Sequence, residues 1–290
     1  MFEAFSRSWE ITKLSLDVIR KDKELLLFPL LAGIFSAIFF IAMLFPTILS
    51  SLLFGDSQAL STFGSVFDFI IVFLTYFGLA FIAVFFNVCV VYTTKKRFEG
   101  GNATFIESLK FAFSKIHLVF LWSLVSATVG LILRLIDNAA EKSGNIGKLL
   151  LRITTSILGT VWSIVTIFVI PGLVYHNLGP LAAIKKSIEV LKKTWGESLI
   201  RYYGTGLVQF AFIILWFLLT LILIIVGIPL GGIALVIVIS LSAISFIFII
   251  IFFNLINSIF NTALYVYADT GKIPSGYSKN VMSNAFARKK

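Results

Sequence analysis

Six long apolar runs occupy most of this chain and limit the folds open to it. A helix that crosses a membrane needs about 20 predominantly apolar residues, and each run is at least that long. Short polar and charged segments separate the runs. The pattern predicts an all-α integral membrane bundle of about six transmembrane helices, over residues 25–54, 66–94, 116–135, 149–175, 203–226 and 231–268.

The composition supports hydrocarbon as the surrounding medium. Of the 290 residues, 59% are hydrophobic and 13% are charged, whereas a soluble domain has about 25% charged residues. A water-soluble fold could not cover so much apolar surface with so few charges. The single cysteine, Cys89, lies inside an apolar run, which excludes a disulfide framework or a thiolate metal cluster.

The last two runs are separated only by Gly227-Ile228-Pro229-Leu230-Gly231-Gly232. Proline ends or kinks a helix and glycine allows unusual backbone angles, so this segment predicts a tight hairpin. The final run, 231–268, is longer than one straight crossing requires. Either it tilts and extends into the cytoplasm, or part of it lies along the membrane interface.

The distribution of basic residues predicts the orientation. If both ends are cytoplasmic, twenty of the 24 Lys and Arg residues lie inside, and the reverse orientation would place twenty outside. The positive-inside rule therefore favours a protein of the cytoplasmic membrane with both termini in the cytoplasm. The net charge of +10 is spread over the span ends rather than gathered in one patch, which argues against nucleic acid as a partner.

Three cytoplasmic segments, 3–13, 105–115 and 184–193, resemble one another. Each has apolar residues at helical spacing and lysines or glutamates on the opposite face, which is typical of a helix lying in the membrane plane. Thr104-x-x-Glu107 predicts a capping box, and Pro180 suits a first helical turn. The apolar stripes are Phe2, Phe5, Trp9, Leu16 and Ile19; then Phe105, Leu109, Ala112 and Ile116; then Ile184, Ile188, Leu191 and Trp195.

We interpret residues 1–268 as a single polytopic membrane domain made of three copies of one unit, an amphipathic surface helix followed by two spans. The copies cover residues 1–98, 101–177 and 179–268, and residues 269–290 form a basic cytoplasmic tail. Each copy begins and ends in the cytoplasm, so the repeats are parallel. The alternative is convergence of unrelated segments on a basic amphipathic helix.

Catalytic signatures are absent from the sequence. It contains no His-Glu-x-x-His, no Gly-x-Ser-x-Gly and no phosphate-binding glycine loop, so we expect no catalytic residues, no cofactor and no metal. The span interiors carry essentially no charge, which argues against proton-coupled transport and charged-ion permeation. A protein that handles lipid remains compatible with this pattern, because its substrate needs no ion site.

Two sets of residues are candidates for a functional site. The basic faces favour anionic lipid headgroups, with about 1 kcal/mol per charge near the surface. The alternative is that they only enforce topology, and both roles can hold at once. The amides of the spans could line a polar path, or they could form interhelical hydrogen bonds worth roughly 0.6–2 kcal/mol each. The lysines are Lys185, Lys186, Lys192 and Lys193, and the amides are Asn254, Asn257 and Asn261 in one stripe, with Asn87 and Gln209 on other spans.

Two stretches carry a family resemblance. Pro171-Gly172 together with residues 179–187 resembles several uncharacterised prokaryotic membrane families, and also the membrane region attached to some bacterial glycerophosphodiester phosphodiesterases. Residues 262–267, followed by 270–274, resemble the closing signature of one such family with a domain of unknown function. The resemblance implies a prokaryotic cytoplasmic-membrane protein. The phosphodiesterase catalytic domain has no counterpart here, so its activity is not implied.

These observations lead to two functional hypotheses. The first is a non-enzymatic membrane protein that engages lipids or membrane partner proteins through its basic cytoplasmic helices. The second is a permease or efflux component for an apolar or lipid-like substrate, with the asparagines of the sixth span along its path.

Overall fold

The structure, a computed structural model, describes residues 2–54, 61–195 and 205–283. Over these ranges the chain forms helices joined by short turns and contains no β-strand. The predicted all-α class with six spans is confirmed. The segments long and apolar enough to cross a membrane are Lys23–Phe45, Phe69–Phe98, Ile116–Glu141, Asn145–His176, Gly206–Leu230 and Gly232–Thr270.

The fourth predicted run, 149–175, is one helix in the sequence pattern but two in the structure. Helix α6 (Asn145–Val165) ends and α7 (Val169–His176) begins after a short break. Pro171 has no N–H to donate to the carbonyl of Ile167, and its ring clashes with that carbonyl, so a regular helix cannot continue. Within the break the N–H of Val169 donates to the carbonyl of Thr166 at 3.0 Å, which is a tighter turn.

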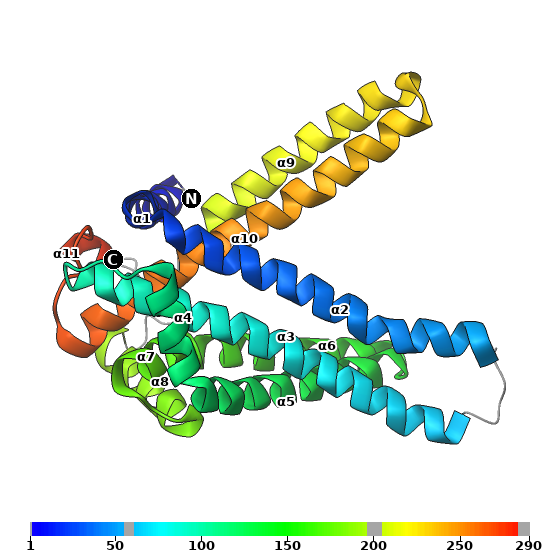
Figure 1. Ribbon diagram of the computed structural model, residues 1–290, viewed down its shortest axis with the longest axis horizontal. Coiled ribbons are helices and arrows are strands. Elements are labelled where there is room, and N and C mark those ends of the chain that lie inside the picture. The colour runs from blue at the N-terminus through cyan, green and yellow to red at the C-terminus, as the bar shows by residue number, and fades with distance from the viewer. Residues whose placement is uncertain (1, 55–60, 196–204, 284–290) are drawn as a thin grey trace. The chain divides into compact units, whose positions relative to one another are not determined.

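The predicted hairpin between the last two spans is confirmed (Figure 1). Helix α9 (Gly206–Gly227) leads through a 3₁₀ turn, η4 (Ile228–Leu230), into α10 (Gly232–Thr270). Gly231 adopts a φ of 95°, which glycine tolerates because it has no Cβ. The start predicted for the fifth span, at residue 203, lies outside the described residues.

Helix α10 runs without a break for 39 residues, so at about 1.5 Å per residue it is nearly twice as long as a hydrocarbon core of about 30 Å. Its first half exposes large apolar side chains, such as Ile237 and Ile244. Its second half, from Phe253 onward, contributes most of the buried residues of the helix. The long helix therefore combines an exposed apolar half with a half that is packed inside the protein.

The chain divides into two compact units, and unit 1 comprises Met1–Pro29, Thr93–Ala103 and Lys192–Lys290. In this unit α1 (Phe2–Lys21) packs against α9 and α10. The core includes Ile256, Ile259 and Phe260 of α10, which are fully buried. Segments from both ends of the sequence thus share one core.

The segment after α10 folds back onto unit 1. Tyr277 is only 8% exposed, and its ring lies 5.9 Å from that of Phe98 and 6.2 Å from that of Phe260, between centroids. Its hydroxyl shares a 2.8 Å hydrogen bond with Ser15 Oγ. Burial raises the pKa of the Tyr277 phenol well above its usual range, although the bond to Ser15 opposes this shift. Part of the predicted tail is therefore core, and residues 284–290 lie outside the described part.

Unit 2 comprises Leu30–Tyr92 and Thr104–Leu191. It holds most of α2 (Leu27–Phe54) and α3 (Ser61–Phe98), then α4 (Phe105–Ser114), α5 (Ile116–Glu141), α6, α7 and most of α8 (Pro180–Trp195). Helices α5 and α6 form an antiparallel pair in which the rings of Trp122 and Trp162 stack at 5.8 Å.

Candidate functional site

The three predicted surface segments are helices, and the two starts that were predicted, those of α4 and α8, are confirmed. Thr104 caps α4 in a reciprocal box, in which its N–H donates to Glu107 Oε2 at 2.8 Å and the N–H of Glu107 donates to Thr104 Oγ1 at 3.3 Å. Helix α8 begins at Pro180, where the missing proline N–H costs no hydrogen bond.

Each of these helices buries a serine in the same register. In all three, an apolar residue precedes the serine by three positions, another follows it directly, and charged residues stand one before and two after it. The residue four positions later, on the same helix face, is also buried. The stripes of large apolar residues predicted for these three segments do not reveal this pattern. An alignment of the three segments on their small residues would reveal it. The serines are Ser8, Ser108 and Ser187, each 0% exposed.

Two of the serines hold the start of a neighbouring helix. Ser8 Oγ accepts a hydrogen bond from the N–H of Val208, in the first turn of α9, and Ser187 Oγ accepts one from the N–H of Phe168, the residue before α7. Both bonds are 3.3 Å long. N–H groups at a helix start have no partner within the helix, and these two buried hydroxyls accept hydrogen bonds from such groups.

We expect Ser187→Ala to lower the free energy of unfolding by about 1 kcal/mol, because the buried N–H of Phe168 loses its acceptor. Denaturation of the purified protein in detergent would measure this. Ser114→Ala is the matched control, since Ser114 is exposed at the end of α4 and should change stability by less than about 0.5 kcal/mol. Equal effects of the two substitutions would contradict the assigned role of Ser187.

The face that α8 buries differs from the stripe predicted for it. Ala183, Ser187 and Val190 are buried, whereas Ile184 and Ile188 of the predicted stripe are only half-buried. Of that stripe Leu191 is buried, and the side chain of Trp195 lies outside the described part. The small side chains of Ala183 and Ser187 lie on the buried face beside the larger Val190 and Leu191, so the buried face is turned away from the predicted stripe.

The four predicted lysines lie on two sides of α8. Residues of an α-helix are about 100° apart, so Lys185 and Lys192 share one side, and Lys186 and Lys193 share another. Lys185, Lys192 and Lys193 are exposed, and Lys186 is half-buried. Lys185 and Lys192 border an outer apolar stripe formed by Leu181, Ile184 and Ile188, of which Leu181 is 72% exposed.

Helix α1 has the same division of faces. Ser8, Thr12 and Ser15 are buried toward the rest of unit 1, whereas Phe5 and Trp9 are more than two fifths exposed. The side chain of Phe2 lies outside the described part. Such a helix packs one face on protein and leaves a second, apolar stripe that is bordered by charged residues. This arrangement is typical of helices at the membrane interface.

The predicted amides of the spans are only partly brought together. On α10, Asn257 Oδ1 accepts a 2.5 Å hydrogen bond from the hydroxyl of Thr205, one turn before Gln209 of α9. Asn254 is exposed and Asn261 is half-buried. Asn87 belongs to unit 2, whereas the other four amides belong to unit 1.

A family model described as a family of unknown function (DUF6159) matches residues 66–276, which is more than half of the chain. The match includes both α4 and α8 and extends past the end of α10. No curated protein matches the chain.

Proposed function

The chain belongs to this family of unknown function, and we propose that it is a non-enzymatic protein of the cell membrane that engages anionic lipid headgroups through its amphipathic helices. The observation that carries the proposal is the outer stripe of α8, in which exposed Leu181 and half-buried Ile184 and Ile188 are bordered by Lys185 and Lys192. The apolar stripe suits the acyl boundary, and the ammonium groups suit the phosphates above it.

The proposal includes an orientation and an internal repeat. Both termini are placed in the cytoplasm of a prokaryotic cell, where the basic span ends would meet the anionic leaflet. The equivalent buried serines, Ser8, Ser108 and Ser187, support three copies of one unit. Membrane partner proteins could use the same helices. The resemblance to the membrane region of glycerophosphodiester phosphodiesterases concerns only the membrane part and adds no activity.

The lysines can be tested by charge reversal in the reconstituted protein. We expect Lys185→Glu with Lys192→Glu to lower the preference for anionic over zwitterionic lipids more than tenfold, since two lysines contribute about 2 kcal/mol together. The fraction of spin-labelled anionic lipid in contact with the protein would measure this preference.

The matched control is Lys142→Glu with Lys148→Glu. It makes the same change in net charge, but at the turn between α5 and α6, which we place on the opposite side of the membrane. This control should leave the preference of the protein for anionic over zwitterionic lipids unchanged. If the two double variants behave alike, or if the original protein shows no preference for anionic lipid, the headgroup proposal is wrong.

A second candidate function is a permease or efflux component for an apolar or lipid-like substrate. The observation that favours it is Asn254, an exposed amide of α10, because an amide facing hydrocarbon is costly unless it finds a polar partner. We expect Asn254→Leu, in protein that still folds, to reduce accumulation or export of such a substrate severalfold. Asn257→Leu tests the position one turn further along α10, and unchanged transport in both variants would remove these two asparagines from the path.

A further inference from the structure

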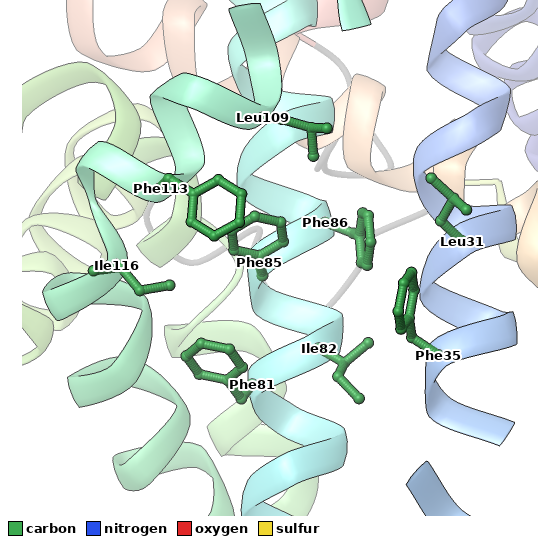
Figure 2. A pocket seen from close by; sticks show the side chains of 9 residues that line it. All are labelled: Leu31, Phe35, Phe81, Ile82, Phe85, Phe86, Leu109, Phe113 and Ile116. Carbon is green, nitrogen blue, oxygen red and sulfur yellow. The ribbon is translucent and has the colours of Figure 1, made fainter. Parts of the chain in front are cut away.

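An apolar groove lies over α3 in unit 2 (Figure 2). Helix α3 forms its floor, α2 supplies Phe35 to one wall, and Phe113 of α4 and Ile116 of α5 form the other. All nine lining side chains are hydrocarbon, and five of them are phenylalanines. No single stretch of sequence marks this groove, because its walls come from separate helices.

The groove has a cavity volume of about 500 Å³, within the range of about 300–1,000 Å³ found for small-molecule pockets. Water in such a cavity would find no hydrogen-bond partner among the lining side chains. The occupant must therefore be apolar, and it must be narrow enough to lie between helices.

Aromatic pairs hold the two walls in place. The ring of Phe35 stacks with that of Phe86 at 5.9 Å, and Phe113 meets Phe85 edge-on at 4.9 Å. Such pairs fix ring positions beyond the effect of burial alone. Yet Phe35 and Phe113 remain half or more exposed, so the groove is accessible from the medium around the protein, which for a membrane span is lipid.

A positive charge lies at the edge of the groove on α4. Lys110 is exposed and follows Leu109, a lining residue, and on the helix it is about 60° from Phe113. The side chain of Lys115 turns elsewhere, with Nζ 5.8 Å from the ring centroid of Phe111, and Phe111 lies on the opposite side of α4. An apolar groove with a lysine at its border fits a molecule that has a hydrocarbon chain and an anionic group.

We propose that the groove holds one acyl chain of a membrane phospholipid, whose phosphate lies beside Lys110. The inference deepens the proposed lipid binding and rests on it for the class of ligand. It adds a defined site in unit 2 that is separate from the lysines of α8.

The test uses the full chain, reconstituted in vesicles with an increasing fraction of an anionic phospholipid that carries a diazirine on its acyl chain. After illumination, labelled positions are mapped by mass spectrometry of peptides. We expect labelling of the segment of α3 that contains Phe81 and Phe85 to saturate at a low probe fraction. Labelling around Ile132, an exposed residue of α5, should rise in proportion to the probe fraction. Proportional labelling at both places would overturn the proposal.

Two substitutions fill the groove from different helices, Leu109→Trp on α4 and Ile82→Trp on α3. We expect either to reduce groove labelling about tenfold, whereas Ile132→Trp should leave it unchanged. Lys110→Glu should reduce it about fivefold, and Lys115→Gln should not. The saturation measurement needs no variant, so it decides the question even if one tryptophan variant fails to fold.

The remaining outcomes separate this site from the proposed function. Reversing Lys185 and Lys192 should lower the general anionic preference and leave groove labelling intact. If that preference falls while groove labelling is proportional to the probe, the proposed function stands and the acyl site is wrong. Absence of lipid adducts on the groove peptides at every probe fraction, as expected if a second copy of the chain covers the groove, would also overturn it.

Discussion

Asp22→Ala is expected to lower the free energy of unfolding by about 3 kcal/mol, because it leaves the guanidinium of Arg97 without its counter-ion. Asp22 Oδ2 lies 3.2 Å from Arg97 Nη2, and the side chains are 3% and 25% exposed. The same nitrogen donates to the carbonyl of Lys21 at 3.1 Å and to Asn102 Oδ1 at 2.6 Å. Arg97 keeps these acceptors and is partly exposed. The expected loss of unfolding free energy is therefore near the lower end of the range for breaking a buried ion pair.

The measurement is equilibrium denaturation in detergent micelles, with Asp17→Ala as the control. Asp17 pairs with Arg20 at 3.4 Å, but both side chains are more than half exposed, so its loss should cost little. Replacing both partners, by Asp22→Leu with Arg97→Met, should recover much of the stability, since no charge is then left unpaired. A loss for Asp22→Ala no larger than that for Asp17→Ala would show that the ion pair does not stabilise unit 1.

Tyr277→Ala is expected to lower the free energy of unfolding by about 3–5 kcal/mol, the usual loss for truncating a large buried aromatic side chain. The ring packs between Phe98 and Phe260, so its removal would leave a cavity where the C-terminal segment meets the core. Limited proteolysis should then cut the segment after α10 much faster. Tyr277→Phe keeps the ring and loses only the bond to Ser15, so it should cost about 1 kcal/mol.

Ile273→Ala is the control within the same segment, because Ile273 is 42% exposed and its truncation should change stability and proteolysis little.

The pH dependence of stability gives a second test. The pKa of the Tyr277 phenol is raised in the folded chain. The stability that the neutral phenol contributes is therefore complete below the ordinary tyrosine pKa of about 10 and is lost as the pH rises above it. This loss should be absent in Tyr277→Phe. Unchanged proteolysis of Tyr277→Ala would contradict the role of this residue as an anchor.

The candidate site was predictable only in part. The lysine-bearing helices follow from periodicity, which is local, and α4 and α8 begin at the expected cap and proline. The buried face of α8 did not follow from the periodicity, because Ala183 and Ser187 are not large apolar residues. Ser187 is buried where it accepts a hydrogen bond from the N–H of Phe168, and a contact between two helices does not follow from the periodicity of one of them.

The sequence by itself determined the membrane class, the number of spans and the hairpin at Gly231, because partition between hydrocarbon and water depends on local composition and turns depend on adjacent residues. Only the tertiary structure decided which distant residues meet. Ser8 with Val208, Asp22 with Arg97, and Ser15 with Tyr277 join segments far apart in the chain. The apolar groove is likewise made by separate helices. Such contacts depend on side-chain shape and on the directions of hydrogen bonds between helices, which no local stretch of sequence contains.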